Sequence, residues 1–369
     1  APRPSCRTCS LGTDSGDVTI AKAPFVNRLR YAEPMELRRL PKVELHLHLD
    51  CSLSYKAVAR LAPSVSREEY LRDYVAPARC TNLADFLSRA PMGFRLMQTE
   101  EALRAVTEDL FEQLAEDGVI YAELRFAPLL HLEKGLSAER VVAAVERATE
   151  ELARATGVEA ELILCTLRHF NAEQSMETVR LVEQFRGSRV AALDIAGDEA
   201  GFPLDAHVRA YKYAREHGLP RTAHAGEACG PESVWQTLRL LDPQRIGHGT
   251  RSIEDAALVE HLRREKIHLE LCPSSNVQIV PSIACWEEHP VDRLFKAGVS
   301  LNLNTDTRML NPVTLTGEYE GMHHIFGWGE AEFLRTNLMA VEAAFTDDVT
   351  KQGLRNRLKA SYGMMAPIV

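Results

Sequence analysis

The chain has 369 residues, 45% of them hydrophobic and 26% charged, and its formal net charge is −9. This ordinary globular composition suits one large domain, and the evenly mixed acidic balance argues against nucleic-acid or membrane binding, which usually requires a basic patch. No apolar run reaches the roughly 18 residues that a membrane span needs. The eight cysteines are scattered, so we expect reduced thiols and a cytoplasmic location.

The first segment, residues 1–34, contains Pro, Ser and Arg without a clear period and lacks the apolar core of a signal peptide. We expect it to be an extension outside the folded domain. The remainder, residues 35–369, shows no internal repeat or low-complexity linker. It is therefore predicted to form a single domain.

From residue 42 onward, short apolar runs typical of strands alternate with longer stretches of helical periodicity. In 137–156, for example, apolar residues recur at intervals of three and four. Eight strands that are each followed by a helix predict an α/β fold of the (β/α)8 TIM barrel type, with a longer helical insertion over about 55–117 after the first strand. The strand candidates are 42–47, 119–126, 159–166, 189–195, 219–224, 245–248, 267–272 and 298–304.

Polar side chains cluster where these predicted strands end. In a (β/α)8 barrel the carboxyl ends of the strands and the loops that follow them carry the chemistry. Residues far apart in the sequence are therefore expected to meet in one pocket. They are His46 and His48 of the first strand, Asp194 of the fourth, His224 of the fifth, His248 of the sixth and Asp306 after the eighth.

The His46-Leu47-His48 motif is the first candidate for metal binding. Residues i and i+2 of a strand point to the same side, so both imidazoles can bind one metal, with His224 and Asp306 as further ligands. Structural histidines, and an aspartate that caps a helix, are the alternatives. Three histidines and one aspartate suit a catalytic Zn²⁺, which lowers the pKa of a bound water toward neutrality, although other divalent metals also fit this set.

Two glycine-containing motifs predict the groups that move protons. Gly226 allows a sharp turn, so that Glu227 can point back at a substrate and protonate a ring nitrogen, although an ordinary strand-to-loop turn is the alternative. Glycines on both sides leave the His248 imidazole reachable, where it can steer or deprotonate a water; a buried, satisfied histidine is the alternative. These groups suffice for hydrolytic attack on an electron-poor carbon.

Seven motifs in order resemble the adenosine deaminase family of the amidohydrolase superfamily and span nearly all of residues 35–360. The specificity of the match comes from their number and order rather than from any one of them. They are PKVELHLHLD (41–50), YAELRFAP (121–128), LDIAGDE (193–199), HAGE (224–227), RIGHGTRSIED (245–255), LELCPSSN (269–276) and LNTD (303–306).

This resemblance implies a role for each matching residue. Glu227 is similar to the acid that protonates N1 of the purine, and His248 to the group that orients the attacking water. The backbone N–H of Gly197 resembles the donor to purine N3, and Asp194 resembles a carboxylate that orients a ligating histidine. One Zn²⁺ per chain is implied, with the ligands His46, His48, His224 and Asp306.

Further residues resemble the family's substrate contacts. Asp50 is similar to the carboxylate that binds the ribose 5′-hydroxyl, which favours a nucleoside over adenine; the alternative is a helix cap. Leu83, Phe86 and Leu87, at helical spacing, resemble the apolar helix that covers the nucleoside, and a core-facing stripe is the alternative.

Two residues depart from the family pattern. Thr307 stands where a second aspartate usually binds purine N7, although its hydroxyl can still donate to N7, and Cys51 stands where glycine is usual. The resemblance implies a small-molecule purine nucleoside as substrate, with adenosine or 2′-deoxyadenosine deaminated to inosine or 2′-deoxyinosine plus ammonia. Another 6-aminopurine (adenine or a modified adenine nucleoside) and a non-catalytic nucleoside-binding homologue are the alternatives. AMP is disfavoured, because Asp50 would repel its phosphate.

Overall fold

The computed structural model of the protein describes residues 36–280 and 282–363. The expected extension over residues 1–34 lies outside the described residues. Within the described ranges, no helix combines the length and the apolar character that a membrane crossing demands.

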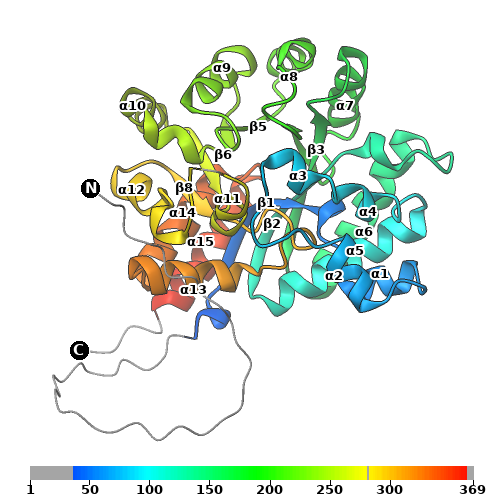
Figure 1. The fold of residues 1–369 in the computed structure, drawn as a ribbon, viewed down its shortest axis with the longest axis horizontal. Coiled ribbons are helices and arrows are strands. Elements are labelled where there is room, and N and C mark those ends of the chain that lie inside the picture. The colour runs from blue at the N-terminus through cyan, green and yellow to red at the C-terminus, as the bar shows by residue number, and fades with distance from the viewer. Residues whose placement is uncertain (1–35, 281, 364–369) are drawn as a thin grey trace, which may run out of the picture. The chain divides into compact units, whose positions relative to one another are not determined.

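Eight parallel strands form the centre of the fold (Figure 1). They pair in two sheets of four, in the orders β1-β2-β3-β4 and β5-β6-β7-β8. Bridges between Leu193 and Arg221 and between Leu47 and Asp306 join the two sheets at both seams and close the ring. The predicted (β/α)8 barrel is confirmed. The strands are β1 (Lys42–His48), β2 (Val119–Phe126), β3 (Glu159–Leu167), β4 (Val190–Ala196), β5 (Thr222–Ala225), β6 (Arg245–His248), β7 (His268–Leu271) and β8 (Leu301–Leu303).

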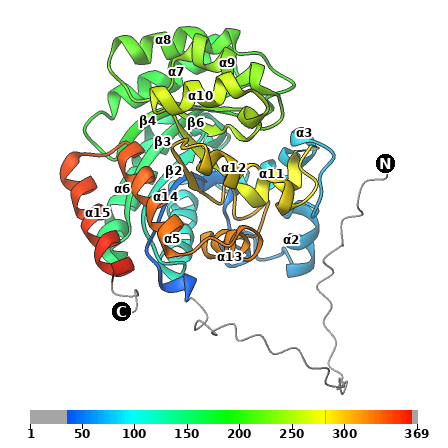
Figure 2. The same cartoon turned by 90° about the vertical axis from the view of Figure 1, so that its left-hand side faces the viewer.

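Helices follow the strands around the outside of the barrel, as Figures 1 and 2 show for α7 to α10. Between β1 and β2 lie α1 (Tyr55–Leu61), α2 (Arg67–Asp73), α3 (Leu83–Leu87), α4 (Ala90–Phe94) and α5 (Glu100–Glu116), so the predicted helical insertion is present. The remaining helices are α6 (Ala138–Thr156), α7 (Ala172–Gln184), α8 (Val208–Glu216), α9 (Pro231–Leu241), α10 (Ala256–Glu265), α11 (Pro273–Ile279), α12 (Val291–Lys296), α13 (Leu315–Phe326), α14 (Glu330–Ala343) and α15 (Asp348–Gly363).

Helix α6 shows how the sequence determines these elements. The side chain of Ser137 accepts a hydrogen bond from the Arg140 N–H at the start of the helix, which satisfies one of its free amides. Val141, Val145 and Ala148 recur at intervals of three and four and are fully or almost fully buried. The helix therefore lies with this apolar stripe against the barrel and its charged face in solvent.

The barrel interior below the active end holds charged side chains. Arg125 from β2 contacts Asp194 of β4 and Glu270 of β7, and Arg245 of β6 contacts the other oxygen of Glu270. All four side chains are at most 1% exposed. Because isolated charges are costly to bury, this pairing is what allows the interior to be polar.

Candidate active site

Ligand-type side chains converge where the strands end. His46 of β1, His224 of β5, His248 of β6 and Asp306 after β8 place one ligand atom each within 4.8 Å of one another. His48 adjoins this cluster, because its Nε2 lies 3.2 Å from His224 Nε2 and 3.5 Å from Asp306 Oδ1. The structure thus brings together five of the six residues that the sequence places at these strand ends, and the sixth, Asp194, lies directly behind His224.

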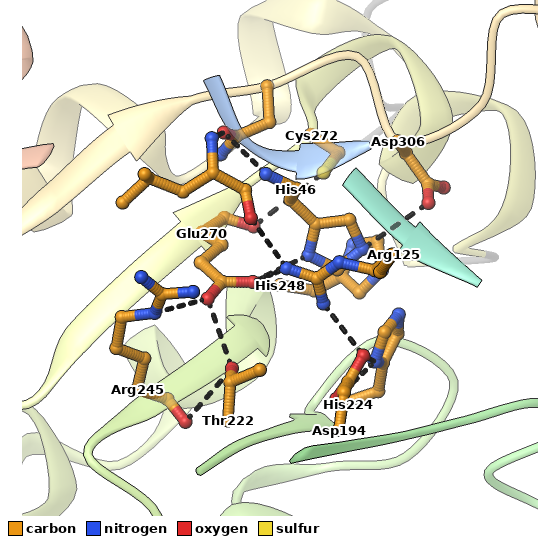
Figure 3. Close-up of polar contacts among 12 residues, drawn as sticks. His46, Arg125, Asp194, Thr222, His224, Arg245, His248, Glu270, Cys272 and Asp306 are labelled. Atoms are coloured by element: carbon orange, nitrogen blue, oxygen red, sulfur yellow. Dashed lines mark hydrogen bonds and ion pairs between the residues drawn. The ribbon is translucent and has the colours of Figure 1, made fainter. Parts of the chain in front are cut away.

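The orientation of two imidazoles is fixed from behind by carboxylates (Figure 3). His46 Nδ1 lies 2.8 Å from Glu270 Oε2, and His224 Nδ1 lies 3.2 Å from Asp194 Oδ1. In the neutral imidazole a ring nitrogen that faces a carboxylate carries the hydrogen, which leaves a lone pair on Nε2 of each ring. Both lone pairs are therefore available to the cluster.

The lone pair of His46 meets another acceptor rather than a donor. His46 Nε2 lies 3.3 Å from Asp306 Oδ1, and within the described chain it is a buried nitrogen without a hydrogen-bond partner. Asp306 Oδ2 already accepts a hydrogen bond from Ser275 Oγ at 2.7 Å. A divalent cation bound by nitrogen and oxygen would reconcile these facing acceptors, so the residues present fit a metal site.

The carboxylates behind the cluster are held in place by arginine. Although burial opposes ionisation, the charges of Arg125 and Arg245 hold the pKa of Glu270 well below its ordinary value. Arg125 also contacts Asp194 Oδ2 at 2.8 Å, so one guanidinium fixes the carboxylates behind both His46 and His224. The roles of Arg125 and Glu270 were not predicted, although both lie within the motifs that carry the family resemblance.

Glu227 lies in the loop after β5 and is only 4% exposed. Burial raises the pKa of its carboxyl well above the ordinary value, and the charges of Asp306 and Glu199 raise it further. A raised pKa favours the protonated form of a carboxyl group, which is the form that can donate a proton. Its side chain lines the same cavity as His48, His224 and Asp306.

The loop that carries Glu227 is held by a second carboxylate, Glu199, which the sequence reasoning missed. Glu199 accepts hydrogen bonds from four consecutive backbone N–H groups, at 2.7 Å from Gly226, 3.1 Å from Glu227, 2.7 Å from Ala228 and 2.9 Å from Cys229. Gly226 has φ +70°, which glycine adopts without strain. Glu199 is the last residue of the LDIAGDE motif, and its place in that motif was the only available signal.

His248 is 1% exposed and its backbone has φ +62°. Its Nε2 lies 3.5 Å from Glu227 Oε1. The neighbouring glycine does not act as expected: a Cβ on Gly247 would lie 2.9 Å from His46 Cε1 and 3.3 Å from His224 Cγ. Gly247 is therefore required for the packing of two other imidazoles, and the interpretation that it leaves His248 unshielded was incomplete.

A cavity of about 420 Å³ extends from this cluster to the insertion between β1 and β2. The side chains of Leu83, Phe86 and Leu87 on α3 line it, together with Gly197 after β4. None of the described residues that line the cavity is Lys or Arg. The cavity is thus apolar on the α3 side and polar beside the imidazoles.

The remaining substrate candidates also border this cavity. Asp50 Oδ2 accepts a hydrogen bond from the Ala127 N–H at 3.0 Å, and Ser54 rather than Asp50 caps α1. Thr307 is 3% exposed, and its Oγ1 has no hydrogen-bond partner within the described chain. Cys51 lies in a 3-10 turn over Leu49–Cys51 without a positive φ, so this turn does not require glycine.

A closed (β/α)8 barrel with a buried His/Asp cluster beside a buried carboxyl group of raised pKa places the protein among the metal-dependent hydrolases built on this fold. The sequence profile described as adenosine deaminase matches residues 41–361, and the chain belongs to this family of hydrolytic deaminases.

Individual relatives agree with this assignment. An adenosine deaminase of Lacticaseibacillus paracasei is 36% identical over 332 residues, which are 88% of this chain and 97% of the relative. Among solved structures, an adenine deaminase from Arthrobacter aurescens has a TM-score of 0.80 at 26% identity and covers 87% of this chain and 98% of its own. The N6-mAMP deaminase of Arabidopsis has a TM-score of 0.79 at 25% identity and covers 88% of this chain and 99% of its own.

Proposed function

We propose that the protein deaminates adenosine and 2′-deoxyadenosine hydrolytically, to inosine or 2′-deoxyinosine and ammonia, with Zn²⁺ as cofactor. The observation that carries this proposal is the convergence of imidazole lone pairs and a carboxylate beside the buried carboxyl of Glu227. The similarity to a relative that is an adenosine deaminase supports the substrate. The proposed metal ligands are His46, His48, His224 and Asp306.

The donor set fits zinc better than magnesium or calcium. Imidazole nitrogen is a good ligand for Zn²⁺, whereas the two harder cations prefer oxygen ligands. A bound Zn²⁺ lowers the pKa of a water ligand toward neutrality and so supplies hydroxide at physiological pH. Glu270 and Asp194 keep the ligating rings of His46 and His224 in the tautomer that leaves Nε2 unprotonated.

Glu227 is the proposed general acid. Burial raises the pKa of its carboxyl, which favours the protonated form, and the side chain lines the cavity next to the cluster. Protonation of purine N1 would draw electron density from C6 and prepare this carbon for attack. Glu199 holds the Glu227 backbone in place, so that little reorganisation is needed when substrate binds.

The cavity favours an uncharged nucleoside over a nucleotide. The described residues that line it include Asp50 and Asp198 but no Lys or Arg, so a 5′-phosphate would meet negative charge without compensation. Asp50 can instead accept a hydrogen bond from a ribose hydroxyl. The cavity also continues past Asp50 to Leu87 and Phe94, which provides room for a sugar beyond the base and favours adenosine over adenine.

Three further contacts are proposed for the purine ring and the sugar. The Thr307 hydroxyl, buried without a partner in the described chain, can donate a hydrogen bond to N7. The backbone N–H of Gly197 is the proposed donor to N3. The apolar side chains of α3 that line the cavity, those of Leu83, Phe86 and Leu87, would cover the nucleoside.

The test is turnover of a purine panel, followed by the ultraviolet change that accompanies loss of the 6-amino group. The panel contains adenosine, 2′-deoxyadenosine, adenine, AMP, N6-methyladenosine and N6-methyl-AMP. We expect adenosine and 2′-deoxyadenosine to have the highest kcat/KM, and AMP to be turned over at least about a hundredfold less efficiently. Preference for adenine or for a monophosphate would overturn the proposed substrate, while silence on all six with zinc bound would overturn the proposed activity.

A further inference from the structure

A chain of buried polar groups runs outward from His248 and has no part in the function proposed so far. Its members are Asn276 on α11 and His289, which lies two residues before α12. The Nδ1 atom of His248 lies 3.1 Å from Asn276 Nδ2, and Asn276 Oδ1 lies 3.2 Å from His289 Nε2. Asn276 is fully buried and His289 is 2% exposed, so these contacts decide where each hydrogen lies.

The far end of this chain is a backbone N–H group, which can only donate a hydrogen bond. The backbone N–H of Val291 donates to His289 Nδ1 at 3.1 Å, so this nitrogen is an acceptor. Burial lowers the pKa of His289 to about 3, and the ring is therefore neutral. Its single hydrogen must lie on Nε2, where it faces Asn276 Oδ1.

The orientation of the Asn276 amide follows from this donor. Its Oδ1 accepts from His289 Nε2 at 3.2 Å and from Thr250 Oγ1 at 2.7 Å. The NH2 group of the amide must then point at His248. An amide nitrogen can only donate, so His248 Nδ1 is an acceptor and the hydrogen of this ring lies on Nε2.

We propose that His289 and Asn276 are positioning residues that hold His248 in its neutral tautomer with the hydrogen on Nε2. In this tautomer the ring has no lone pair left for a metal or for a proton from water. His248 then acts as a hydrogen-bond donor at the reacting oxygen, and its Nε2 lies 3.5 Å from Glu227 Oε1 on the same side of the ring. This assignment of the oxygen rests on the proposed function, whereas the tautomer itself does not.

The proposal separates two histidines that border the cluster. His248 lies within the group of ligand atoms that are 4.8 Å or less apart, but its only lone pair faces Asn276. His48 Nε2, at 3.2 Å from His224 Nε2, is then the fourth ligand. The proposal also chooses between steering and deprotonation of the water, because a general base would need a free lone pair on Nε2.

The variant Asn276→Asp distinguishes a hydrogen-bond donor from a general base at His248, because the two roles predict opposite changes in kcat. Aspartate is nearly isosteric and still accepts hydrogen bonds from Thr250 and His289, but it presents an acceptor to His248 Nδ1 and so moves the hydrogen from Nε2 to Nδ1. If His248 is a donor, we expect kcat on adenosine to fall at least about tenfold with KM and zinc content unchanged. Equal or faster turnover in Asn276→Asp would overturn the proposal.

A matched pair at His289 tests the outer half of the chain. Gln at this position retains a side-chain N–H that can donate to Asn276 Oδ1, whereas Leu has a similar volume and no donor. We expect His289→Leu to lower kcat more than His289→Gln, with equal zinc content. Equal kcat in the two variants would show that His289 serves packing alone and would overturn its positioning role.

The tautomer can be read directly, without activity. In the full chain labelled with ¹⁵N-histidine, the signals of His248 are those lost in His248→Gln. We expect the wild-type ring, with and without zinc, to show its hydrogen on Nε2, and the ring in Asn276→Asp to show it on Nδ1. A wild-type ring protonated on Nδ1 would overturn the proposal even if adenosine is turned over, and a chain silent on every purine still gives this result. Circular dichroism excludes misfolded variants, and the wild-type spectrum decides the question if Asn276→Asp does not fold.

Discussion

The two halves of the barrel differ in construction. Strands β1 to β4 have 7, 8, 9 and 7 residues, whereas β5 to β8 have 4, 4, 4 and 3. The first half supplies Asp50, Gly197 and, through the insertion after β1, the apolar wall of α3. The second half supplies His224, Glu227, His248 and Asp306, so most of the proposed reacting groups follow short strands.

Short strands allow the chain to turn where the reacting side chains are needed. His248 and Asp306 have φ values of +62° and +65°, and both end or follow strands of the second half. Non-glycine residues in this region cost on the order of 1 kcal/mol each and persist only where their surroundings fix them. Long strands instead place Arg125 and Asp194 deep in the barrel, where they hold the ligands from behind. The first half thus acts as a frame that also supplies the ligands His46 and His48, whereas the second half directs the other reacting side chains into the cavity.

The largest effect should come from the second half. In Glu227→Gln the amide cannot protonate N1, and we expect kcat on adenosine to fall by about 10³-fold while zinc remains bound. The measurement is single-turnover kinetics together with metal analysis of the same sample. Near-normal turnover would remove Glu227 from the mechanism and weaken the contrast between the two halves.

Loss of a ligand or of its support should lower metal affinity. His224→Ala is expected to lose zinc as well as activity. Asp194→Asn, which is a change in the first half, should weaken zinc binding by about 10- to 100-fold, because the amide orients His224 poorly and removes one of the two carboxylate partners of Arg125. Competition with a chelator measures this affinity, and the exposed Asp205→Asn removes the same charge as a control. Full zinc affinity in Asp194→Asn would show that the long strands do not support the site.

Phe86 separates enclosure of the substrate from packing of the core. Phe86→Leu should raise KM for adenosine by about tenfold, since part of the apolar wall of the cavity is lost, and should lower the free energy of unfolding by about 1–2 kcal/mol. Phe111→Leu on α5 makes the same change at a fully buried position outside the cavity. We expect it to lower stability without a change in KM; the same KM in both variants would show that α3 packs the core only.

The smallest expected effect is on the pH dependence of stability and comes from β3, a long strand of the first half. Burial raises the pKa of Glu161 on β3 to about 8, so the native state binds this proton more tightly than the unfolded chain does. The stability from this group is complete below the unfolded pKa near 4.5 and is lost as the pH rises through 8. Glu161→Gln stays neutral, so its advantage over the wild type in thermal unfolding should grow to about 1 kcal/mol across this window. A difference that is constant with pH would contradict this.

The sequence predicts which segments form strands more accurately than it predicts the residues at which these strands begin and end. The run 119–126 coincides with β2, because it is long and fully buried. The predicted strand 298–304 is longer than β8, which consists of three residues within it. The predicted strand 219–224 begins three residues before β5. Apolar loop residues such as Leu219 and Val299 are buried like strand residues, so periodicity alone does not separate them from the strands.

At the site, the meeting of the reacting side chains could be predicted from the fold, whereas the residues that hold them in place could not. A parallel barrel brings the ends of its strands together, so the meeting of His46, His224 and Asp306 follows from their places in the chain. Glu199 and Asn276 act through partners on other elements, namely four loop amides and a ring nitrogen. Nothing in their local sequence specifies these partners, and their roles became visible only in three dimensions.

The Glu199 carboxylate gives the loop after β5 an unusual property. Consecutive backbone amides at the start of a helix are a common binding site for phosphate, and here such a group directly precedes α9. The protein's own side chain already occupies these amides, and Ser233 Oγ at 2.5 Å adds a fifth donor. These amides are therefore satisfied before any ligand arrives, and the loop does not offer them to an incoming anion.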